Sequence, residues 1–332
     1  YLLIKFYYGS KDNVIAANKA FIVNRVGDFG FLLGVVTLFF ALGQVDLSFG
    51  TIEANIGNTT NSLLILSGFL LFVGAMGKSA QVPLYVWLPD AMAGPTPISA
   101  LIHAATMVTA GVYMVARFHF LYSGIEEIGL FIAYVGAISA LLAAVIATKQ
   151  TDIKKILAYS TMSQLGYMFI AVGLGFYSTG LFHVFTHAFF KAMLFMGAGG
   201  IIIALHHEQN IFKIAKHRAN LPIIGLTFLI GVIAISGIPP FSGFFSKDAI
   251  LAAAFQEGQY LIYGIALFTA FLTAYYMFRM YFIVFVAPNH HDVDYVYTSK
   301  TITLPLLILA IGAVGAGFLN LPSIFGGNHF VD

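Results

Sequence analysis

The chain has 332 residues, of which 59% are hydrophobic and only 9% are charged. Soluble domains usually carry about 25% charged residues, so this composition excludes an ordinary water-exposed surface and predicts a polytopic membrane protein. The formal net charge of +2 excludes a surface for polyanions, and we expect no nucleic-acid partner. Because the chain has no cysteine, disulfides and thiolate-bound metal or iron–sulfur sites are excluded as well.

Apolar windows of membrane-spanning length follow one another along nearly the whole chain. A helix needs about 20 apolar residues to cross a bilayer, and the linkers between the windows are short. We expect an all-α polytopic fold, with residues 1–332 forming a single transmembrane domain and no second soluble domain. About nine crossings are predicted. They lie at residues 20–42, 62–77, 97–121, 125–148, 156–175, 178–205, 221–238 continuing at 243–256, 259–286 and 301–320.

The chain begins with the apolar run YLLIKFYYG and not with Met. This run is too short to span a bilayer and lacks the features of a signal peptide. We therefore expect Tyr1 to lie near the end of a helix whose first part precedes this sequence, so that the chain is a fragment.

Charged residues alternate between the two sides of the predicted bundle. One side, which we name side A and which includes the segment before residue 20, collects the bases Lys11, Lys19, Arg25, Lys149, Lys154, Lys155, Lys213, Lys216, Arg218 and Lys300. The opposite side B carries mainly acids, namely Asp46, Glu53, Glu126, Glu127 and Glu257, with Arg117 as a nearby base. Because Lys and Arg are enriched in cytoplasmic loops, side A is expected to face the cytoplasm, matrix or stroma. The alternation requires residues 62–94 to form one crossing and residues 221–256 another.

Those two crossings are interrupted by proline and glycine. The first break is GKSAQVPLYVWLPDAMAGPTP and the second is SGIPPFSGFFSKD. A membrane tolerates such a break only where protein or water satisfies the backbone groups that it frees, and paired breaks point to inverted-repeat transporters. Lys78 and Lys247 lie beside the two breaks. Because the breaks are about five spans apart, we expect a repeat of about five helices with an incomplete first copy. Loops and helix ends hold every other basic residue except Lys191.

Lys191 belongs to a ladder of titratable groups in the apolar stretch LFHVFTHAFFKAMLF. His183, His187 and Lys191 are spaced so that they drift by only about 40° per step on one helix face while climbing roughly 6 Å. Titratable groups inside a membrane helix are costly and indicate a functional path by default. His103 lies in a second apolar stretch, ISALIHAATMV. Because imidazole shuttles protons near neutrality, these residues together predict a buried proton path.

Other interpretations of these residues stay open. A lysine beside a break can extend its ammonium to the interface, and a single histidine can be a hydrogen-bonded core residue. His183 and His187 also have the spacing of two zinc ligands on one helix, or could ligate a haem. No Glu follows the first histidine, however, and no third ligand is near in sequence. We therefore expect no metal on this chain.

Further charged residues are candidates for supporting roles. Asp28, in NRVGDFG, lies one turn from Arg25, so the two side chains are expected to pair. Asp248 directly follows Lys247 and is expected to tune it. Asp152 begins a helix in TDIKKILAYS, where a carboxylate suits the helix dipole, so capping and function are both open.

Several motifs are distributed along nearly the whole chain, namely NRVGDFG, GKSAQVPLYVWLPDAMAGPTPISALIHAATMVTAGVYMVAR, QTDIKKILAYSTMSQLGYMF, THAFFKAMLFMGAGG, HHEQNIF and GFFSKDAI. These motifs resemble the antiporter-like subunits of respiratory complex I, a family shared with Mrp-type Na⁺/H⁺ antiporter subunits. Within that group the chain is most similar to the distal L subunits of bacterial NADH:quinone oxidoreductase, because the middle antiporter-like subunit carries a glutamate where Lys247 stands.

The resemblance implies proton translocation through two inverted five-helix repeats. Residues 1–121 would be the remainder of the first repeat, 122–286 the second, and 287–332 a C-terminal helix region. The proton-path residues of the family match Lys78, His103, His183, His187, Lys191 and Lys247. Acids that the family uses match Asp28 and Asp248, and supporting positions match Arg25 and Asp152. A glutamate in a helix before Tyr1, paired with Lys78, and a long lateral helix after the C-terminus are also implied.

The resemblance further implies an enzyme only at the level of the complex, an H⁺-translocating NADH:quinone oxidoreductase. No redox chemistry is expected on this chain, because NADH, FMN, iron–sulfur clusters and quinone belong to partner subunits. The expected partners are the other membrane subunits, above all the neighbouring antiporter-like subunit, together with the lipid bilayer and protons. The expected location is the bacterial inner membrane, with the mitochondrial inner membrane or the thylakoid as alternatives. A subunit of an Mrp-type Na⁺/H⁺ antiporter and a structural scaffold with paired buried charges stay open as other functions.

Overall fold

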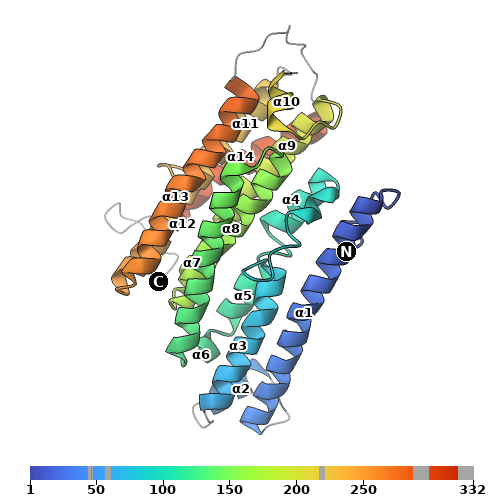
Figure 1. The fold of residues 1–332 in the computed structure, drawn as a ribbon. Coiled ribbons are helices and arrows are strands. Elements are labelled where there is room, and N and C mark those ends of the chain that lie inside the picture. Colours follow the sequence, from blue (N-terminus) through green and yellow to red (C-terminus); the bar gives the residue numbers. More distant parts are fainter. Residues whose placement is uncertain (44–45, 47, 57–60, 217–220, 287–298, 321–332) are drawn as a thin grey trace.

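A computed structural model describes residues 1–43, 46, 48–56, 61–216, 221–286 and 299–320, which form an elongated bundle of helices (Figure 1). Most helices run along the long axis, and the described residues contain no β-strand. An isolated antiparallel bridge joins Asp152 to Asn210, where two loops meet. The helical architecture expected from the composition is confirmed.

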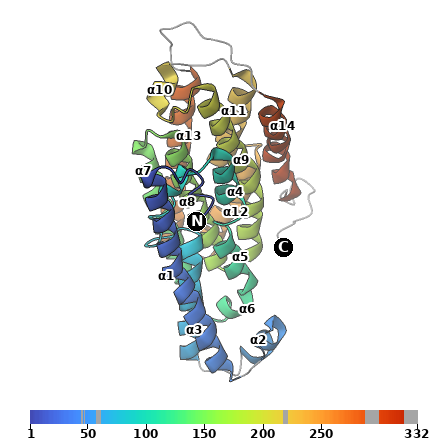
Figure 2. The same ribbon diagram turned by 90° about the vertical axis from the view of Figure 1, so that its right-hand side faces the viewer.

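The helices follow one another along the described chain with short connections. Figure 2 shows α1 and α14 at opposite edges of the bundle. In chain order the elements are α1 (Lys11–Leu42), α2 (Phe49–Asn55), α3 (Asn61–Lys78), the 3-10 helix η2 (Asp90–Ala93), α4 (Thr96–Ala104), α5 (Ala110–Arg117), α6 (His119–Tyr122), α7 (Glu126–Lys149), α8 (Ile153–Gly173), α9 (Tyr177–Ala204), α10 (Ile211–Lys216), α11 (Pro222–Ser236), α12 (Ser242–Gln256), α13 (Tyr260–Tyr281), the π turn η3 (Phe282–Val286), α14 (Lys300–Gly315) and the 3-10 helix η4 (Ala316–Asn320).

Six helical segments of the described chain are long and apolar enough to cross a membrane: α1, α7, α8, α9, α13 continued by η3, and α14 continued by η4. Two shorter apolar helices, Ser62–Lys78 and Pro222–Ser236, end at the predicted breaks. α1 begins at Lys11, earlier than the predicted crossing at residue 20, because an apolar window does not register the polar first turns of a helix. The total of about nine crossings stays a prediction.

The crossing predicted at residues 97–121 is wrong as a continuous helix, because the structure divides it into α4, α5 and α6. The helical hydrogen bonds stop at Ala104. The Val108 amide donates to Ile102 O at 3.4 Å and not to Ala104 O. The Thr109 hydroxyl donates to Ala105 O at 2.7 Å. Hydroxyls that occupy backbone acceptors compete with helix formation. The carbonyl of Ala104 is thereby left without its helical donor.

The break predicted in SGIPPFSGFFSKD separates α11 from α12. α11 ends at Ser236, and Gly237 takes a left-handed backbone with φ 77°, which glycine adopts without strain. Pro239 has no N–H, so the carbonyl of Ile235, one turn earlier, loses its helical donor. The first predicted break, residues 79–95, lies between α3 and α4 and consists of turns and η2. Both crossings are interrupted where the prolines predict.

α7 and α8 pack against each other through small residues. A Cβ added at Gly136 of α7 would lie 2.6 Å from Gly166 O of α8, and one added at Gly173 would lie 2.6 Å from Ala133 N of α7. Small residues let membrane helices approach until their backbones touch. The approach holds α8 inside the bundle, where nearly all of its residues are buried.

The connections between helices gather at two ends of the bundle. α2 and α6 lie at one end and α10 lies at the other in both views (Figures 1 and 2). The Asp152–Asn210 bridge joins the α7–α8 and α9–α10 connections near α10, which is the grouping that the charge alternation predicts for side A. The orientation of the two ends in the cell stays a prediction.

The close approach of α7 and α8 gives a stability prediction. Gly136→Ala adds a methyl group that meets Gly166 O, so the thermal midpoint of the assembled protein should fall although alanine favours helix by about 1 kcal/mol. Gly264→Ala, in α13, is the matched control, because an added Cβ there meets nothing within 4 Å. Equal midpoints for the two variants would contradict the packing described here.

Candidate functional site

The three ladder residues of α9 are all buried in the interior of the bundle. His183, His187 and Lys191 each have 0% of their surface exposed. Because α9 packs against α4, α8 and α12, the ladder lies where these helices meet. Buried polar groups require partners from neighbouring elements, and the ladder residues take theirs from α4, α8 and α12.

His183 links α8 to α12. Its Nδ1 lies 2.8 Å from Ser246 Oγ of α12, and its Nε2 lies 3.1 Å from Gln164 Oε1 of α8. The Thr186 hydroxyl, also on α9, lies 2.9 Å from the same Ser246 Oγ. The resulting chain of hydrogen-bonding groups ends beside Lys247, the next residue along α12.

Lys247 is 3% exposed and takes its acceptor from the second break. Its Nζ donates to Ile235 O at 3.1 Å, and this is the carbonyl that Pro239 deprives of a helical partner. The ammonium also lies 4.9 Å from the centroid of the Tyr167 ring, a distance at which a cation is attracted to an aromatic face. The break therefore creates the polar environment that a lysine needs at this depth.

Lys191 is held by α8. Its Nζ donates to Leu157 O at 3.3 Å and to the Ser160 hydroxyl. Neither partner carries a formal charge, and the four ion pairs found among the described residues do not include Lys191. A buried charge without a counter-ion is sensitive to any charge that arrives nearby.

His187 takes its partner from the break between α4 and α5. Its Nδ1 lies 2.9 Å from Ala104 O, the carbonyl that the break frees. A carbonyl only accepts, so Nδ1 carries the hydrogen and the lone pair of the neutral ring lies on Nε2. Among the described residues, Nε2 of His187 and both ring nitrogens of His103 are buried without a partner. Such atoms are ordinarily satisfied by ordered water, so the centre of the site has the chemistry of a hydrated path.

Lys78 belongs to a second cluster between α1 and α3. Its Nζ lies 3.0 Å from Asp28 Oδ1, and Arg25 reaches the other carboxylate oxygen of Asp28 at 3.4 Å. The predicted Arg25–Asp28 pair is confirmed, and the closer Lys78–Asp28 pair was not predicted. The Lys78 side chain is 37% exposed and lines cavities of about 290 and 140 Å³. Sequence reasoning left both burial and extension of the ammonium to the interface open for Lys78, and in the described chain the side chain is partly exposed.

Two predicted acids lie away from the ladder. Asp248 is exposed, because consecutive helix positions point about 100° apart and Lys247 faces inward. Lys247 bonds Ile235 O, and its tuning by Asp248 stays a prediction. Asp152 is the N-cap of α8 and accepts from the amides of Lys154 and Lys155 at 2.8 and 3.1 Å. That geometry explains Asp152 as a helix cap.

Sequence reasoning missed the side chains that connect the ladder. Ser160, Gln164 and Tyr167 of α8 contact Lys191, His183 and Lys247 respectively. They occupy positions i, i+4 and i+7 of an apolar helix, which is one helical face. A search for polar residues with helical spacing inside STMSQLGYM would have found this stripe.

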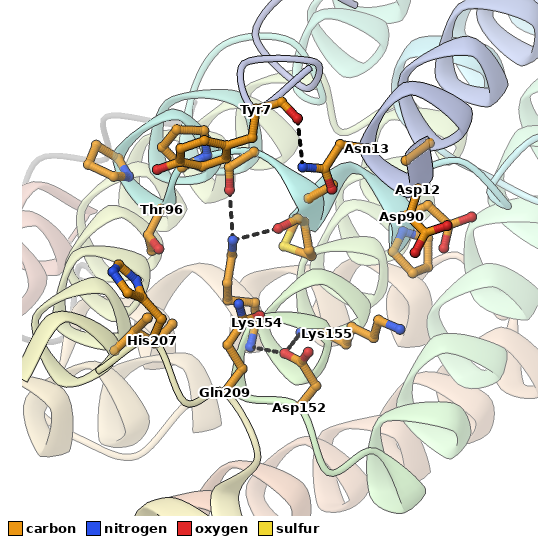
Figure 3. A pocket seen from close by; sticks show the side chains of 18 of the residues that line it. Tyr7, Asp12, Asn13, Asp90, Thr96, Asp152, Lys154, Lys155, His207 and Gln209 are labelled. Carbon is orange, nitrogen blue, oxygen red and sulfur yellow. Dashed lines mark hydrogen bonds between the residues drawn. The ribbon is translucent and has the colours of Figure 1, made fainter. Parts of the chain in front are cut away.

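Sequence reasoning placed Lys154 among the bases at loops and helix ends of side A and did not predict its burial. Lys154 is 4% exposed, and its Nζ donates to Met92 O and to Gly94 O, the latter at 2.8 Å. Figure 3 shows this ammonium between the two carbonyls, at the wall of a cavity of about 620 Å³. Its position at a helix start suggested solvent, because nothing in the sequence shows that the first break folds over it.

Known proteins resemble this chain over nearly its whole length. Residues 1–273 match the model of the family described as NADH:quinone oxidoreductase/Mrp antiporter, transmembrane. The chain belongs to this family. NADH-quinone oxidoreductase subunit L of Escherichia coli (strain K12) is 47% identical and is matched over 98% of this chain and 53% of its own length. Subunit L of Rhodobacter capsulatus is 46% identical and is matched over 98% of this chain and 49% of its own length. The chain thus spans about half the length of the curated relatives it matches.

Two solved structures share the fold. The membrane-bound sulfane sulfur reductase, an archaeal respiratory membrane complex, matches 95% of this chain and 64% of its own chain with a TM-score of 0.86 and 27% identity. The Mrp complex from Dietzia sp. DQ12-45-1b matches 93% of this chain and 34% of its own chain, with a TM-score of 0.80 and 26% identity. The resemblance expected from the motifs and the membrane location are confirmed.

The contact between α8 and Lys191 gives a second stability prediction. Ser160→Ala removes a hydroxyl that accepts from the buried Lys191 ammonium, so the assembled protein should lose about 1–3 kcal/mol of stability. Ser236→Ala is the control, since that hydroxyl bonds only Val232 O of its own helix. Thermal unfolding of both variants tests the contact, and no difference between them would count against it.

Proposed function

We propose that this chain is the proton-translocating part of a membrane subunit of NADH:quinone oxidoreductase. The observation that carries the proposal is the set of buried, hydrogen-bonded groups leading from Lys191 through His187 and His183 to Lys247. Family membership and the names of relatives in Escherichia coli and Rhodobacter capsulatus support the assignment to this complex. The structure of the site suits the movement of protons, which need only a chain of hydrogen-bonding groups.

A proton relay operates here through short transfers between neighbouring groups. His183 bonds Gln164 Oε1 at Nε2 and Ser246 at Nδ1, so the amide oxygen orients the ring by accepting from Nε2, and the imidazole exchanges its proton with Ser246 at Nδ1. Ser246 then connects the imidazole to the α12 segment that carries Lys247. His187 and His103 extend the relay toward Lys191 through their unpartnered nitrogens, with water completing each gap.

The two ends of the relay are the lysines beside the breaks. Lys247 is placed at the second break, and Lys78, paired with Asp28, at the first. We infer that arrival of charge near one lysine alters the charge state of the next, which moves protons in steps. Asp28, Arg25 and Asp152 keep supporting roles in this proposal, as ion-pair partners or a helix cap, and Asp248 keeps a supporting role as a charge next to Lys247 in sequence.

The complex supplies the energy and the redox chemistry. We infer that NADH, FMN, iron–sulfur clusters and quinone are bound by partner subunits, and that this chain has no redox chemistry of its own. We infer that its partners are other membrane subunits, including a neighbouring antiporter-like subunit, and that its membrane is the bacterial plasma membrane, which the bacterial sources of the relatives support.

The repeat organisation is part of the same proposal. Residues 1–121 form the remainder of a first five-helix repeat, 122–286 the second, and 287–332 the C-terminal region, within about nine crossings overall. The interruption of α3–α4 and of α11–α12, each with a lysine beside it, supports the two-repeat arrangement.

Substitution of the terminal lysine tests the function. In the intact complex, Lys247→Ala should slow proton transfer through this subunit by about 10² or more, the usual contribution of a positioned acid–base group. The measurement is protons translocated per NADH oxidised in reconstituted vesicles, with Lys300→Ala, an exposed lysine, as control. Full proton stoichiometry in Lys247→Ala vesicles would refute the assignment.

The likeness to the Mrp complex supports a second candidate, Na⁺/H⁺ antiport. The two functions differ in their driving reaction, which gives a direct test on the native complex in vesicles. Proton uptake driven by NADH in sodium-free medium is the result expected from the first proposal. Proton movement driven by a sodium gradient without NADH would favour the antiporter.

A further inference from the structure

The ammonium of Lys247 has fewer polar partners in the described chain than its three hydrogens can bond. Ile235 O accepts from it at 3.1 Å, and the four ion pairs found among the described residues do not include it. Because the residue is only 3% exposed, an ammonium here needs a further source of attraction to stay charged. The face of the Tyr167 ring, whose centroid lies 4.9 Å from Nζ, provides one.

This contact differs from the other contacts between a cation and a ring in the described chain. In those four contacts the ring is exposed by 40% to 47%, whereas the Tyr167 ring is 0% exposed. The attraction between a cation and an aromatic face is stronger where both groups are removed from water. The Lys247–Tyr167 contact is therefore the one in which the ring contributes most to the stability of the charge.

The position of the Tyr167 ring is set by three neighbouring helices. The preceding residue, Gly166, lies so close to α7 that an added Cβ would be 2.4 Å from Gly136 O. Tyr167 belongs to a buried cluster with small residues of α7, α12 and α13, namely Ala133, Ala137, Ala140, Ala254 and Ala266. Its hydroxyl donates to Ala266 O of α13. The alanines leave space for the ring, and the hydroxyl bond restrains it.

We propose that Tyr167 is the positioning residue of Lys247, and that its buried ring holds the ammonium at the second break as an uncharged counterpart. An aromatic face attracts the ammonium much more than the neutral amine. It therefore favours the charged lysine without fixing it, whereas a carboxylate in this place would retain the proton. The inference rests on the proposed proton relay, because the ammonium of Lys247 acts electrostatically on His183 and Lys191.

Graded fluorination of the ring tests the contact with little change in its shape. In the intact complex, Tyr167→Phe is compared with variants that carry phenylalanine with one, two or three ring fluorines at this position. Fluorine withdraws electrons from the face and weakens its attraction for a cation. The protons translocated per NADH oxidised in reconstituted vesicles should fall stepwise, from near the wild-type value for Tyr167→Phe toward the value of Lys247→Ala. A constant ratio along the series would overturn the proposal, because packing does not depend on the electrons of the ring.

Removal of the ring gives a second comparison in assembled complexes. Tyr167→Leu should lower the ratio at least as far as the most fluorinated ring does. Phe169→Leu is the matched control, because Phe169 is also 0% exposed on α8 but its ring contacts the Phe72 ring. This control should keep the wild-type ratio, and equal losses in the two leucine variants would overturn the positioning role.

Lys247→Ala separates this inference from the proposed function. If Lys247→Ala lowers the ratio and the Tyr167 variants do not, the positioning role fails while the proposed function stands. If Lys247→Ala leaves the ratio unchanged, the proposed function itself fails.

Discussion

Helix breaks inside a bilayer free carbonyl oxygens that water does not reach, and buried cations need acceptors that lipid does not provide. This chain satisfies both requirements with the same contacts. Lys247 takes the carbonyl that Pro239 frees, His187 takes the carbonyl freed at the end of α4, and Lys154 takes two carbonyls of the first break. The breaks and the buried titratable residues are therefore interdependent, and neither would be stable alone.

The neutral character of these partners has a mechanistic consequence. A lysine paired with a carboxylate would be fixed in its charged form, whereas a lysine held by carbonyls and hydroxyls keeps a charge state that depends on its surroundings. Lys78 differs, because Asp28 and Arg25 form an ion-pair cluster around it. The two ends of the relay thus have different electrostatics, one dominated by ion pairs and the other by backbone carbonyls and the Tyr167 ring.

The features that depend on local spacing could be predicted from the sequence. The four-residue period of His183, His187 and Lys191 placed them on one face, and proline placed the breaks after α3 and after α11. Features that depend on contacts between distant segments could not be predicted. The split of α4 from α5 results from threonine hydroxyls in an apolar run, and the burial of Lys154 results from a segment about sixty residues earlier folding over it. Asp248 shows that neighbours in sequence can face different surroundings on a helix, since it is exposed while Lys247 is buried.

The central claim is that the polar groups around the ladder are joined by water into a continuous path. The most direct test is a structure of the intact complex at a resolution that shows ordered water. The account predicts water bonded to His187 Nε2, to the His103 ring nitrogens and to the Gln164 amide nitrogen, all of which are buried without a protein partner among the described residues. Apolar side chains packed against those atoms, with no water between His103 and His187, would contradict it.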